Sequence, residues 1–343
     1  MTTAPVFRPR ATRQLSAADR VNVQALLGRV AERTASWPLA DQLAADLATP
    51  GAADDRPVSV LLDPPVAALD ATSGVHEKGG DDVTKPIAGY AQASRGSAGW
   101  TMQVVTDPVG AGEGRHLAEV GSTIPDVVAT AALVATTVEA VADAGGGVLD
   151  WWVTDRAGPG AGRFAEAIDA IAVDNGFEFD RDLVQMRRAL PADRRSTVAT
   201  RAFVPGHDDE SWLDVNNRAF AGHAEQGTWT VATLHQRTSQ PWFDAAGFRL
   251  HERDGRLAAF CWTKVHDDTD VPIGEIYVIG VDPDFQGLGL GWELTLAGLD
   301  YLGDTGITDA LLYVDGANVA ARGMYERLGF QVQRTDRAYR RHV

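Results

Sequence analysis

The sequence has almost no cysteine. Cys261 is the single thiol among 343 residues, so the chain cannot close a disulfide within itself. It lies in the apolar segment 257–262, which has the pattern of a buried strand, and we interpret it as an inert core thiol. The Cys, His and Asp residues show none of the spacings of a metal site, so we predict no metal.

Basic residues are also scarce. The chain has 31 Lys and Arg against 47 Asp and Glu, a formal net charge of −16. Nucleic-acid surfaces and anionic membranes are bound by basic patches, so we expect neither partner. No apolar run approaches the roughly 20 residues of a spanning helix, and no secretory leader opens the sequence. We therefore expect a cytoplasmic protein, a monomer, that acts on a small molecule.

The length favours two domains over a single core. We place an N-terminal domain at residues 1–190, a polar linker at 191–197 and a C-terminal domain at 198–343. Both halves repeat one order of elements, in which helices and several strands precede a turn, a helix, a strand and a last helix. This pattern predicts an α/β (α+β) fold of two tandem copies, each a mixed, mostly antiparallel sheet flanked by helices.

Apolar spacing and turn residues place the expected elements. The expected helices are 15–30, 38–47, 127–144 and 163–175, then 207–220, 229–237, 288–303 and 318–328. The expected strands are 57–62, 87–92, 101–105, 117–120, 148–154 and 184–190, then 200–204, 248–252, 257–265, 276–281 and 310–314, with a strand pair after 329. A tight hairpin turn is predicted at Asp254-Gly255.

The two halves differ at the turn that precedes the long helix. The first half has Gly121 and Pro125 in segment 121–126, where the second half has three glycines. We therefore expect a degenerate cofactor loop in the first copy. Segment 70–85 is too polar to pack and is predicted to be a flexible surface insertion.

Gly287, Gly289 and Gly291 follow an apolar strand pattern and precede a helical one. Without side chains, the backbone can bend so that successive N–H groups meet a phosphate at the positive end of the helix. A dinucleotide fingerprint, G-x-G-x-x-G, fails because Trp292 or Leu294 takes its last glycine position, and a P-loop fails for lack of a lysine. The stretch predicts a phosphate cradle of another kind.

The remaining pattern is Gln286-x-x-Gly289-x-Gly291, and segment 318–330 follows it with Asn, Tyr-x-x-x-Gly and Phe in helical context. Together these motifs resemble the acetyl-CoA signature of the GCN5-related N-acetyltransferases. The tandem copies and the phrases at 217–229, 262–266 and 274–283 look like a branch of that family that acetylates the cysteinyl amine of an amino sugar–inositol conjugate. The resemblance is close over about residues 198–343 and thin before them.

The resemblance implies acetyl-CoA as co-substrate, held by a strand end, the glycine turn and the start of the last helix. The cofactor-binding residues that it implies are Ile279, Gly280, Val281, Gln286, Gly287, Leu288, Gly289, Leu290, Gly291, Trp292, Asn318, Ala320, Ala321 and Arg322. A backbone N–H at 279–281 would polarise the acetyl carbonyl, with Gly280 letting the strand open toward the cofactor unless it is an ordinary bulge. The turn lacks the basic residues common in the family, so we expect weaker attraction of phosphate.

An amine attacks a thioester only when it is neutral, so a carboxylate near the nitrogen assists by removing a proton. Glu275 stands just before the cofactor turn and is the predicted base; a solvated carboxylate at a strand end is the alternative. The departing thiolate takes up a proton, which by the resemblance comes from Tyr325. The alternative for Tyr325 is a core tyrosine.

The implied acceptor is a polyol that carries an ammonium group, so its site should offer carboxylates and hydroxyls. The resemblance implies as substrate-binding residues Asp41, Glu225, Lys264, Glu275 and Tyr313. Asp41 is otherwise an acid at a helix N-terminus, and Lys264 otherwise extends to solvent. His223 and His266 are interpreted as structural.

Two other functions remain open from the sequence. One is acetyl transfer to another small amine, such as an aminoglycoside or a polyamine. The other is a non-catalytic acyl-CoA-binding module, which the coexistence of Glu275 and Tyr325 with an intact glycine turn disfavours.

Overall fold

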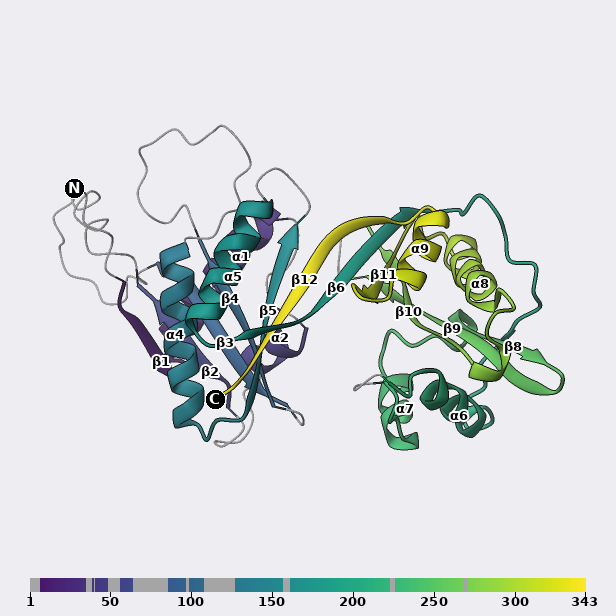
Figure 1. Cartoon of the computed structure of the whole chain (residues 1–343), viewed down its shortest axis with the longest axis horizontal. Coiled ribbons are helices and arrows are strands. Elements are labelled where there is room, and N and C mark those ends of the chain that lie inside the picture. Colours follow the sequence, from purple (N-terminus) through teal and green to yellow (C-terminus); the bar gives the residue numbers. More distant parts are fainter. Residues whose placement is uncertain are drawn as a thin grey trace. The chain divides into compact units, whose positions relative to one another are not determined.

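The computed structural model describes most of the chain (Figure 1). The described residues are 7–34, 39, 41–48, 56–63, 86–96, 99–107, 127–156, 161–222, 226–267 and 271–343. The predicted insertion at 70–85, the predicted strand 117–120 and the predicted degenerate loop 121–126 lie outside them.

The chain forms two compact units. The first comprises Met1–Asp182 and Thr335–Val343, and the second comprises Leu183–Arg334. Strand β6 (Glu178–Ala189) runs out of the first unit into the second, and β12 (Gln331–His342) returns. The sequence placed the boundary at residues 191–197, whereas in the structure the chain passes between the units within these two strands.

The first unit is a sheet with helices on both faces. Its elements are β1 (Pro9–Thr12), α1 (Ala17–Thr34), α2 (Asp41–Ala48), β2 (Val58–Leu62), β3 (Gly89–Arg95), β4 (Trp100–Thr106), α4 (Val127–Asp143), β5 (Val148–Arg156) and α5 (Ala161–Asp174). Helices α4 and α5 share one apolar cluster with the sheet, and α1 and α2 share another. Helix α1 begins as the sequence predicts, because the Ser16 and Asp19 side chains each accept the other's backbone N–H.

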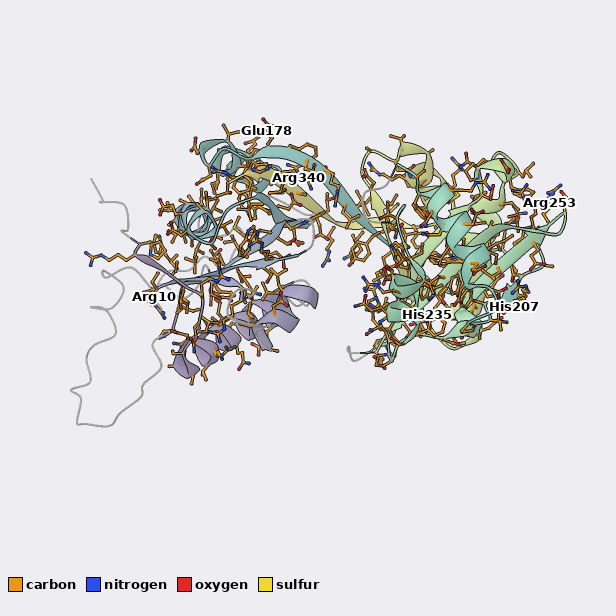
Figure 2. All side chains as sticks on the ribbon, turned by 90° about the horizontal axis from the view of Figure 1, so that it is seen from below. Arg10, Glu178, His207, His235, Arg253 and Arg340 are labelled. Atoms are coloured by element: carbon orange, nitrogen blue, oxygen red, sulfur yellow. The ribbon has the colours of Figure 1, made fainter. Side chains whose placement is uncertain are left out.

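Charged residues of β12 pair within the first unit. Arg340 contacts Asp150 at 2.7 Å and Asp180 at 3.2 Å, and it is labelled in Figure 2. Arg337 contacts Asp182 at 3.1 Å and Asp169 at 3.3 Å. These contacts account for two of the four arginines of a strand that carries few apolar residues.

The second unit repeats the plan. Its elements are β7 (Arg201–Ala202), α6 (Asp209–Ala219), α7 (Val231–Thr238), the short helix η2 (Ala245–Gly247), β8 (Phe248–Arg253), β9 (Arg256–His266), β10 (Ile273–Val281), the short helix η3 (Pro283–Phe285), α8 (Leu290–Asp304), β11 (Asp309–Asp315) and α9 (Val319–Arg327). Its strands lie in the order β6-β11-β10-β9-β8-β7. Helices α8 and α9 cover one face of this sheet, while α6 and α7 cover the other (Figure 1).

The registers confirm a mixed, mostly antiparallel sheet in each unit. Strands β4 and β5 pair in parallel in the first unit, as β10 and β11 do in the second. The predicted hairpin between β8 and β9 turns at Asp254 and Gly255, with φ of 55° and 74°. The predicted two-copy α/β (α+β) fold is therefore correct.

The strands differ from the prediction at two places. The chain after Gly329 forms the single strand β12, because its polar middle continues in extended conformation from one unit into the other. Strand β1 was not predicted, since four residues of mixed polarity carry no period that distinguishes them from a loop; it forms by pairing with β2.

Candidate active site

The turn after β10 is held by a buried carboxylate. Asp282 is 1% exposed, and it accepts hydrogen bonds from the backbone N–H of Asp284 and from Nη1 of Arg218, both at 2.8 Å. Arg218 reaches it from α6 and also contacts Asp284 at 3.0 Å. The path of the chain into the glycine turn is thereby fixed from the opposite face of the sheet.

Two of the three glycines adopt a backbone that disfavours any side chain. Gly287 and Gly289 have φ of 79° and 75°, and Gly289 is the N-cap of α8. Gly289 has no side chain with which to cap the first N–H groups of α8. These uncapped donors lie at the positive end of the helix, which is an anion-binding arrangement.

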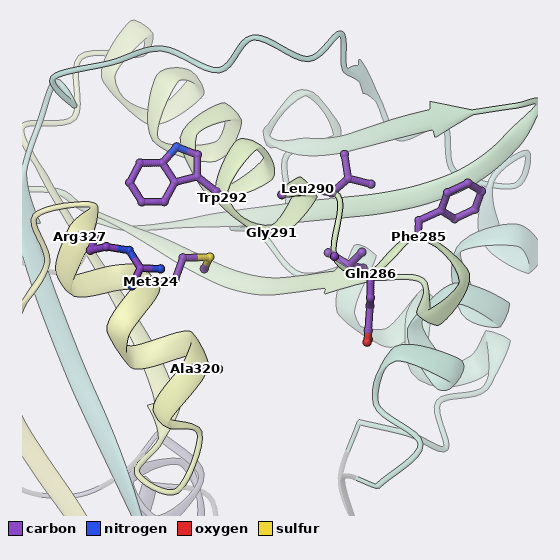
Figure 3. A pocket seen from close by; sticks show the side chains of 11 residues that line it. Phe285, Gln286, Leu290, Gly291, Trp292, Ala320, Met324 and Arg327 are labelled. Carbon is purple, nitrogen blue, oxygen red and sulfur yellow. The ribbon is translucent and has the colours of Figure 1, made fainter.

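A cavity of about 350 Å³ opens between this turn and α9 (Figure 3). Its lining residues are Val281, Phe285, Gln286, Gly287, Gly289, Leu290, Gly291, Trp292, Ala320, Met324 and Arg327. Apart from Arg327 the lining is uncharged. Arg327 is exposed and forms no ion pair with a described carboxylate, so its charge is available to a ligand.

Strand β10 has an open edge beside this cavity. It pairs with β11 at Gly274, Glu275 and Ile276, and among the described residues the register goes no further. On the other side it pairs with β9 as far as Val281. The backbone from Tyr277 to Val281 therefore has groups on its β11 side that no strand occupies, which fits the predicted backbone donor at 279–281.

Glu275 is not a solvated strand-end carboxylate. It is 7% exposed and lies opposite Lys264 of β9. Its Oε2 is 2.7 Å from Nε2 of His266, the last residue of β9. A buried carboxylate held in this way has one oxygen engaged and the other left for a further partner.

Lys264 lies over an aromatic ring rather than free in solvent. Its Nζ is 5.2 Å from the ring centroid of Trp242, which meets the ring of Tyr277 at 5.1 Å. Burial raises the pKa of Tyr277, and the negative charge of Glu275 raises it further while Arg237 lowers it. The ammonium group of Lys264, the hydroxyl of Tyr277 and the carboxylate of Glu275 therefore lie near one another.

Tyr325 is buried on the inner side of α9. It is 6% exposed, and its ring meets Phe330 at 5.8 Å. Burial strongly raises the pKa of Tyr325, and a smaller part comes from Cys261. Cys261 is itself fully buried, which raises its pKa to about 12, so the predicted inert core thiol is confirmed. Tyr325 keeps its proton at neutral pH.

Tyr313 of β11 is 36% exposed, and its hydroxyl accepts hydrogen bonds from Gln185 at 2.7 Å and Arg334 at 3.2 Å.

Asp41 begins α2 in the first unit, and its side chain lies outside what the structure describes. Glu225 and His223 lie outside the described residues as well. Their neighbour Asn217 holds the flanking loop, since its side chain bonds both backbone groups of Trp229.

Within the described residues, no group of three or more His, Cys, Asp and Glu side chains is placed to hold a metal ion. In the same part of the chain, no helix combines the length and apolar character needed to cross a bilayer.

Comparison with known proteins places this site in a family. Residues 210–330 match the acetyltransferase (GNAT) family model. A mycothiol acetyltransferase of Frankia alni is 36% identical over 95% of this chain and 92% of its own length. The chain belongs to the mycothiol acetyltransferase family. Those of Thermobispora bispora and Thermomonospora curvata are 48% and 51% identical, over 59% and 50% of this chain and 68% and 58% of their own lengths.

Solved structures agree on the fold. A GCN5-related N-acetyltransferase from Sphaerobacter thermophilus superposes with a TM-score of 0.66 at 18% identity, over 98% of this chain and 95% of that one. A tandem GNAT protein from the clavulanic acid biosynthesis pathway gives 0.53 at 14% identity, over 98% of each chain. The sequence-based prediction of a tandem GNAT acetyltransferase of mycothiol biosynthesis is confirmed at the level of family and fold.

The structure brings much of the predicted cofactor set to one cavity. The predicted residues that line it are Val281, Gln286, Gly287, Gly289, Leu290, Gly291, Trp292 and Ala320. Leu288 is exposed at the turn, and Ala321 bonds through its N–H to the Asn318 side chain at 3.1 Å. Arg322 instead turns back to the carbonyl of Gly316 at 3.2 Å.

The interpretation of Gly280 needs correction. An added Cβ would lie 2.6 Å from the Phe260 ring, so the missing side chain is needed for packing. The register irregularity that opens β10 lies between Ile276 and Val278, at Tyr277. Gly280 is thus neither the opening nor the bulge in this mycothiol acetyltransferase family member.

Sequence reasoning missed three contributors to the site. Arg327 looks like an ordinary cation at a helix C-terminus, and Arg218 like a surface residue of an amphipathic helix. His266 was interpreted as structural and lay one residue beyond the predicted strand 257–265; in the structure β9 extends to His266, and the two-residue spacing puts it on the same face as Lys264. This spacing was the sequence signal available for His266. The sequence contains no such signal for Arg327 or Arg218.

Proposed function

We propose that the chain transfers the acetyl group of acetyl-CoA to the cysteinyl amine of desacetylmycothiol. The observation that carries the proposal is the combination of a family match over 95% of the chain with a buried carboxylate beside the open edge of β10. The monomeric state and cytoplasmic location stay predictions.

The lining of the cavity suits part of an acetyl-CoA molecule. The uncapped N–H groups at the start of α8 suit the pyrophosphate, and the apolar lining suits the less polar part of the molecule. Arg327 supplies the cation that the turn itself lacks, and we assign it to a phosphate group. Acetyl-CoA, when bound, supplies the acetyl group as a thioester.

Glu275 is proposed to take the proton from the substrate ammonium, directly or through a water molecule. A carboxylate so placed attracts the ammonium before it removes the proton, and burial leaves few water molecules to compete. A backbone N–H between Ile279 and Val281 is proposed to bond the carbonyl oxygen, because the edge that carries it has no strand partner.

Tyr325 is proposed to donate its phenolic proton to the departing thiolate. Its raised pKa keeps it protonated, as a donor must be, and it belongs to the same apolar cluster as Cys261 and Ile279. The proposed substrate contacts of the second unit are Glu225, Lys264, Glu275 and Tyr313, whose charges and hydroxyls suit a polyol with an ammonium group. The assignment of Asp41 in the first unit stays a prediction.

The test measures product by mass spectrometry, because the acceptor's own thiol would obscure thiol release. The full chain is incubated with acetyl-CoA and one acceptor at a time: desacetylmycothiol, the same conjugate without its cysteine, an aminoglycoside or a polyamine. We expect N-acetylation of desacetylmycothiol alone. Acetylation of another amine in its place would refute the assigned substrate, and none at all would refute the proposed activity.

The mechanism is tested with Glu275→Gln and Tyr325→Phe, each of which removes one proton-transfer group at little change in volume. Such groups contribute about 100-fold or more to rate, so kcat should fall by that order while the Kd for acetyl-CoA stays the same. Unchanged kcat in either variant would reject the role of that residue.

A further inference from the structure

The proposed base has a partner that the mechanism has not used. His266 ends β9, and its Nε2 lies 2.7 Å from Oε2 of Glu275. The His266 side chain is 28% exposed, against 9% for that of Glu275, so the imidazole lies between the buried carboxylate and solvent.

The direction of this hydrogen bond follows from the proposed role of Glu275. A base must be a carboxylate, and a carboxylate only accepts hydrogen bonds, so Nε2 of His266 carries the proton and donates. Oε2 is then occupied. Oε1 has no hydrogen-bond partner among the residues that the structure describes, and it is the oxygen left for the substrate amine.

We propose that His266 is a positioning residue for the acetyl transfer: its Nε2–H fixes the Glu275 carboxylate so that Oε1 takes up the ammonium proton. The inference rests on the proposed function. A glutamate has three rotatable bonds, and a base that is displaced by about 1 Å can lose about 100-fold in rate. The hydrogen bond selects one orientation.

The surroundings leave this task to His266. Lys264 lies opposite Glu275, but its Nζ is placed over the Trp242 ring. Tyr277 senses the charge of Glu275 yet forms no hydrogen bond with it among the described contacts. Arg237 acts on Tyr277 from α7. The carboxylate is therefore held by His266 alone of these neighbours.

The experiment compares His266→Ala with His266→Gln in the full chain. The glutamine amide can donate from nearly the position of Nε2, but it cannot accept a proton as an imidazole can. His251 of β8 bonds the carbonyl of Ala199 at 2.8 Å and is outside the site, so His251→Ala is the matched control. Each variant is assayed for kcat, for KM of both substrates and for urea unfolding.

We expect His266→Ala to lower kcat by about 10-fold to 100-fold, with the KM for acetyl-CoA unchanged, and His266→Gln to restore most of the loss. His251→Ala should match the wild type. In the Glu275→Gln background, His266→Ala should cost little more, because a residue that acts through Glu275 loses its effect when the base is gone.

Three results would overturn the inference: unchanged kcat in His266→Ala, equal losses in the alanine and glutamine variants, or additive losses in the double variant. The second would point to proton transfer by the ring itself. These outcomes differ from failure of the proposed function, in which the wild-type chain would acetylate no desacetylmycothiol, and from failure of the role of Glu275, in which Glu275→Gln alone would leave kcat unchanged.

Discussion

Replacing Gly289 with alanine tests whether the backbone of the turn, rather than its lack of bulk, makes the cofactor site. Gly289 has φ of 75° and ψ of 8°, the left-handed region, at the N-cap of α8. An added Cβ would meet no atom within 4 Å. The substitution therefore changes conformational preference without creating a clash.

The magnitude follows from that geometry. Holding an L-residue in the left-handed region costs about 1–2 kcal/mol. If the turn keeps its shape, the free energy of unfolding falls by that amount. If the turn relaxes instead, the N–H groups of α8 leave their positions, and the Kd for acetyl-CoA rises by about fivefold to thirtyfold, since about 1.4 kcal/mol is one factor of ten.

Gly303→Ala is the control, because Gly303 lies within α8, does not line the cavity, and its added Cβ would meet no atom within 4 Å. Alanine favours a helix over glycine by up to about 1 kcal/mol, so the control should be as stable as the wild type or more stable. Urea unfolding and calorimetry with acetyl-CoA measure both effects. The reasoning would be refuted if both variants showed the same free energy of unfolding and the same Kd for acetyl-CoA, or if neither quantity changed in Gly289→Ala.

Three further predictions concern charge, packing and pH. Arg327→Gln should raise the Kd for acetyl-CoA a few-fold, as expected for an exposed ion pair of about 0.2–1 kcal/mol, and added salt should narrow its difference from the wild type. Gly280→Ala should lower the free energy of unfolding by about 1–3 kcal/mol by forcing the Phe260 ring aside; an unchanged urea midpoint would contradict this. Burial alone would raise the pKa of Asp208, but hydrogen bonds, chiefly from Arg201, lower it from 3.8 to about 2. The stability that Asp208 contributes is therefore present above pH 3.8 and lost as pH falls toward 2, so Asp208→Asn should destabilise the chain at pH 7 and approach the wild type at low pH.

The parts of the fold that the sequence predicts well are those set by neighbours along the chain. The Asp254-Gly255 hairpin, the start of the first helix near residue 15 and the glycine turn each depend on a few consecutive residues whose conformational preferences are strong. Their positions in the structure agree with the expectation. The prediction for residues 331–342 was wrong for the opposite reason, because the strand that they form depends on partners far away in the sequence.

The candidate site divides in the same way. The cradle could be predicted because Gly287 and Gly289 mark it in the sequence itself. The contact between Glu275 and His266 could not be predicted from the sequence. It depends on the register of β10 against β9, which sequence patterns do not determine. Arg327 faces the cavity only because α9 packs beside α8, and an exposed arginine carries no sign of that.

The bulge at Tyr277 explains how one strand serves both halves of the reaction. Up to Ile276 the strand pairs with β11, and Glu275 faces away from the cluster under α8 that contains Ile276. Beyond the extra residue the alternation reverses, so that Ile279 and Val281 pack against that same cluster. Without the bulge, Glu275 and Ile279 would share a face. The shift instead leaves the proposed base with Lys264 and His266 on one side, and gives the cavity an unpaired backbone edge where the pairing of β10 with β11 ends. Gly280 cannot produce this change, because its place is filled by Phe260, and the opening that the sequence assigned to a glycine is made by a tyrosine three residues earlier.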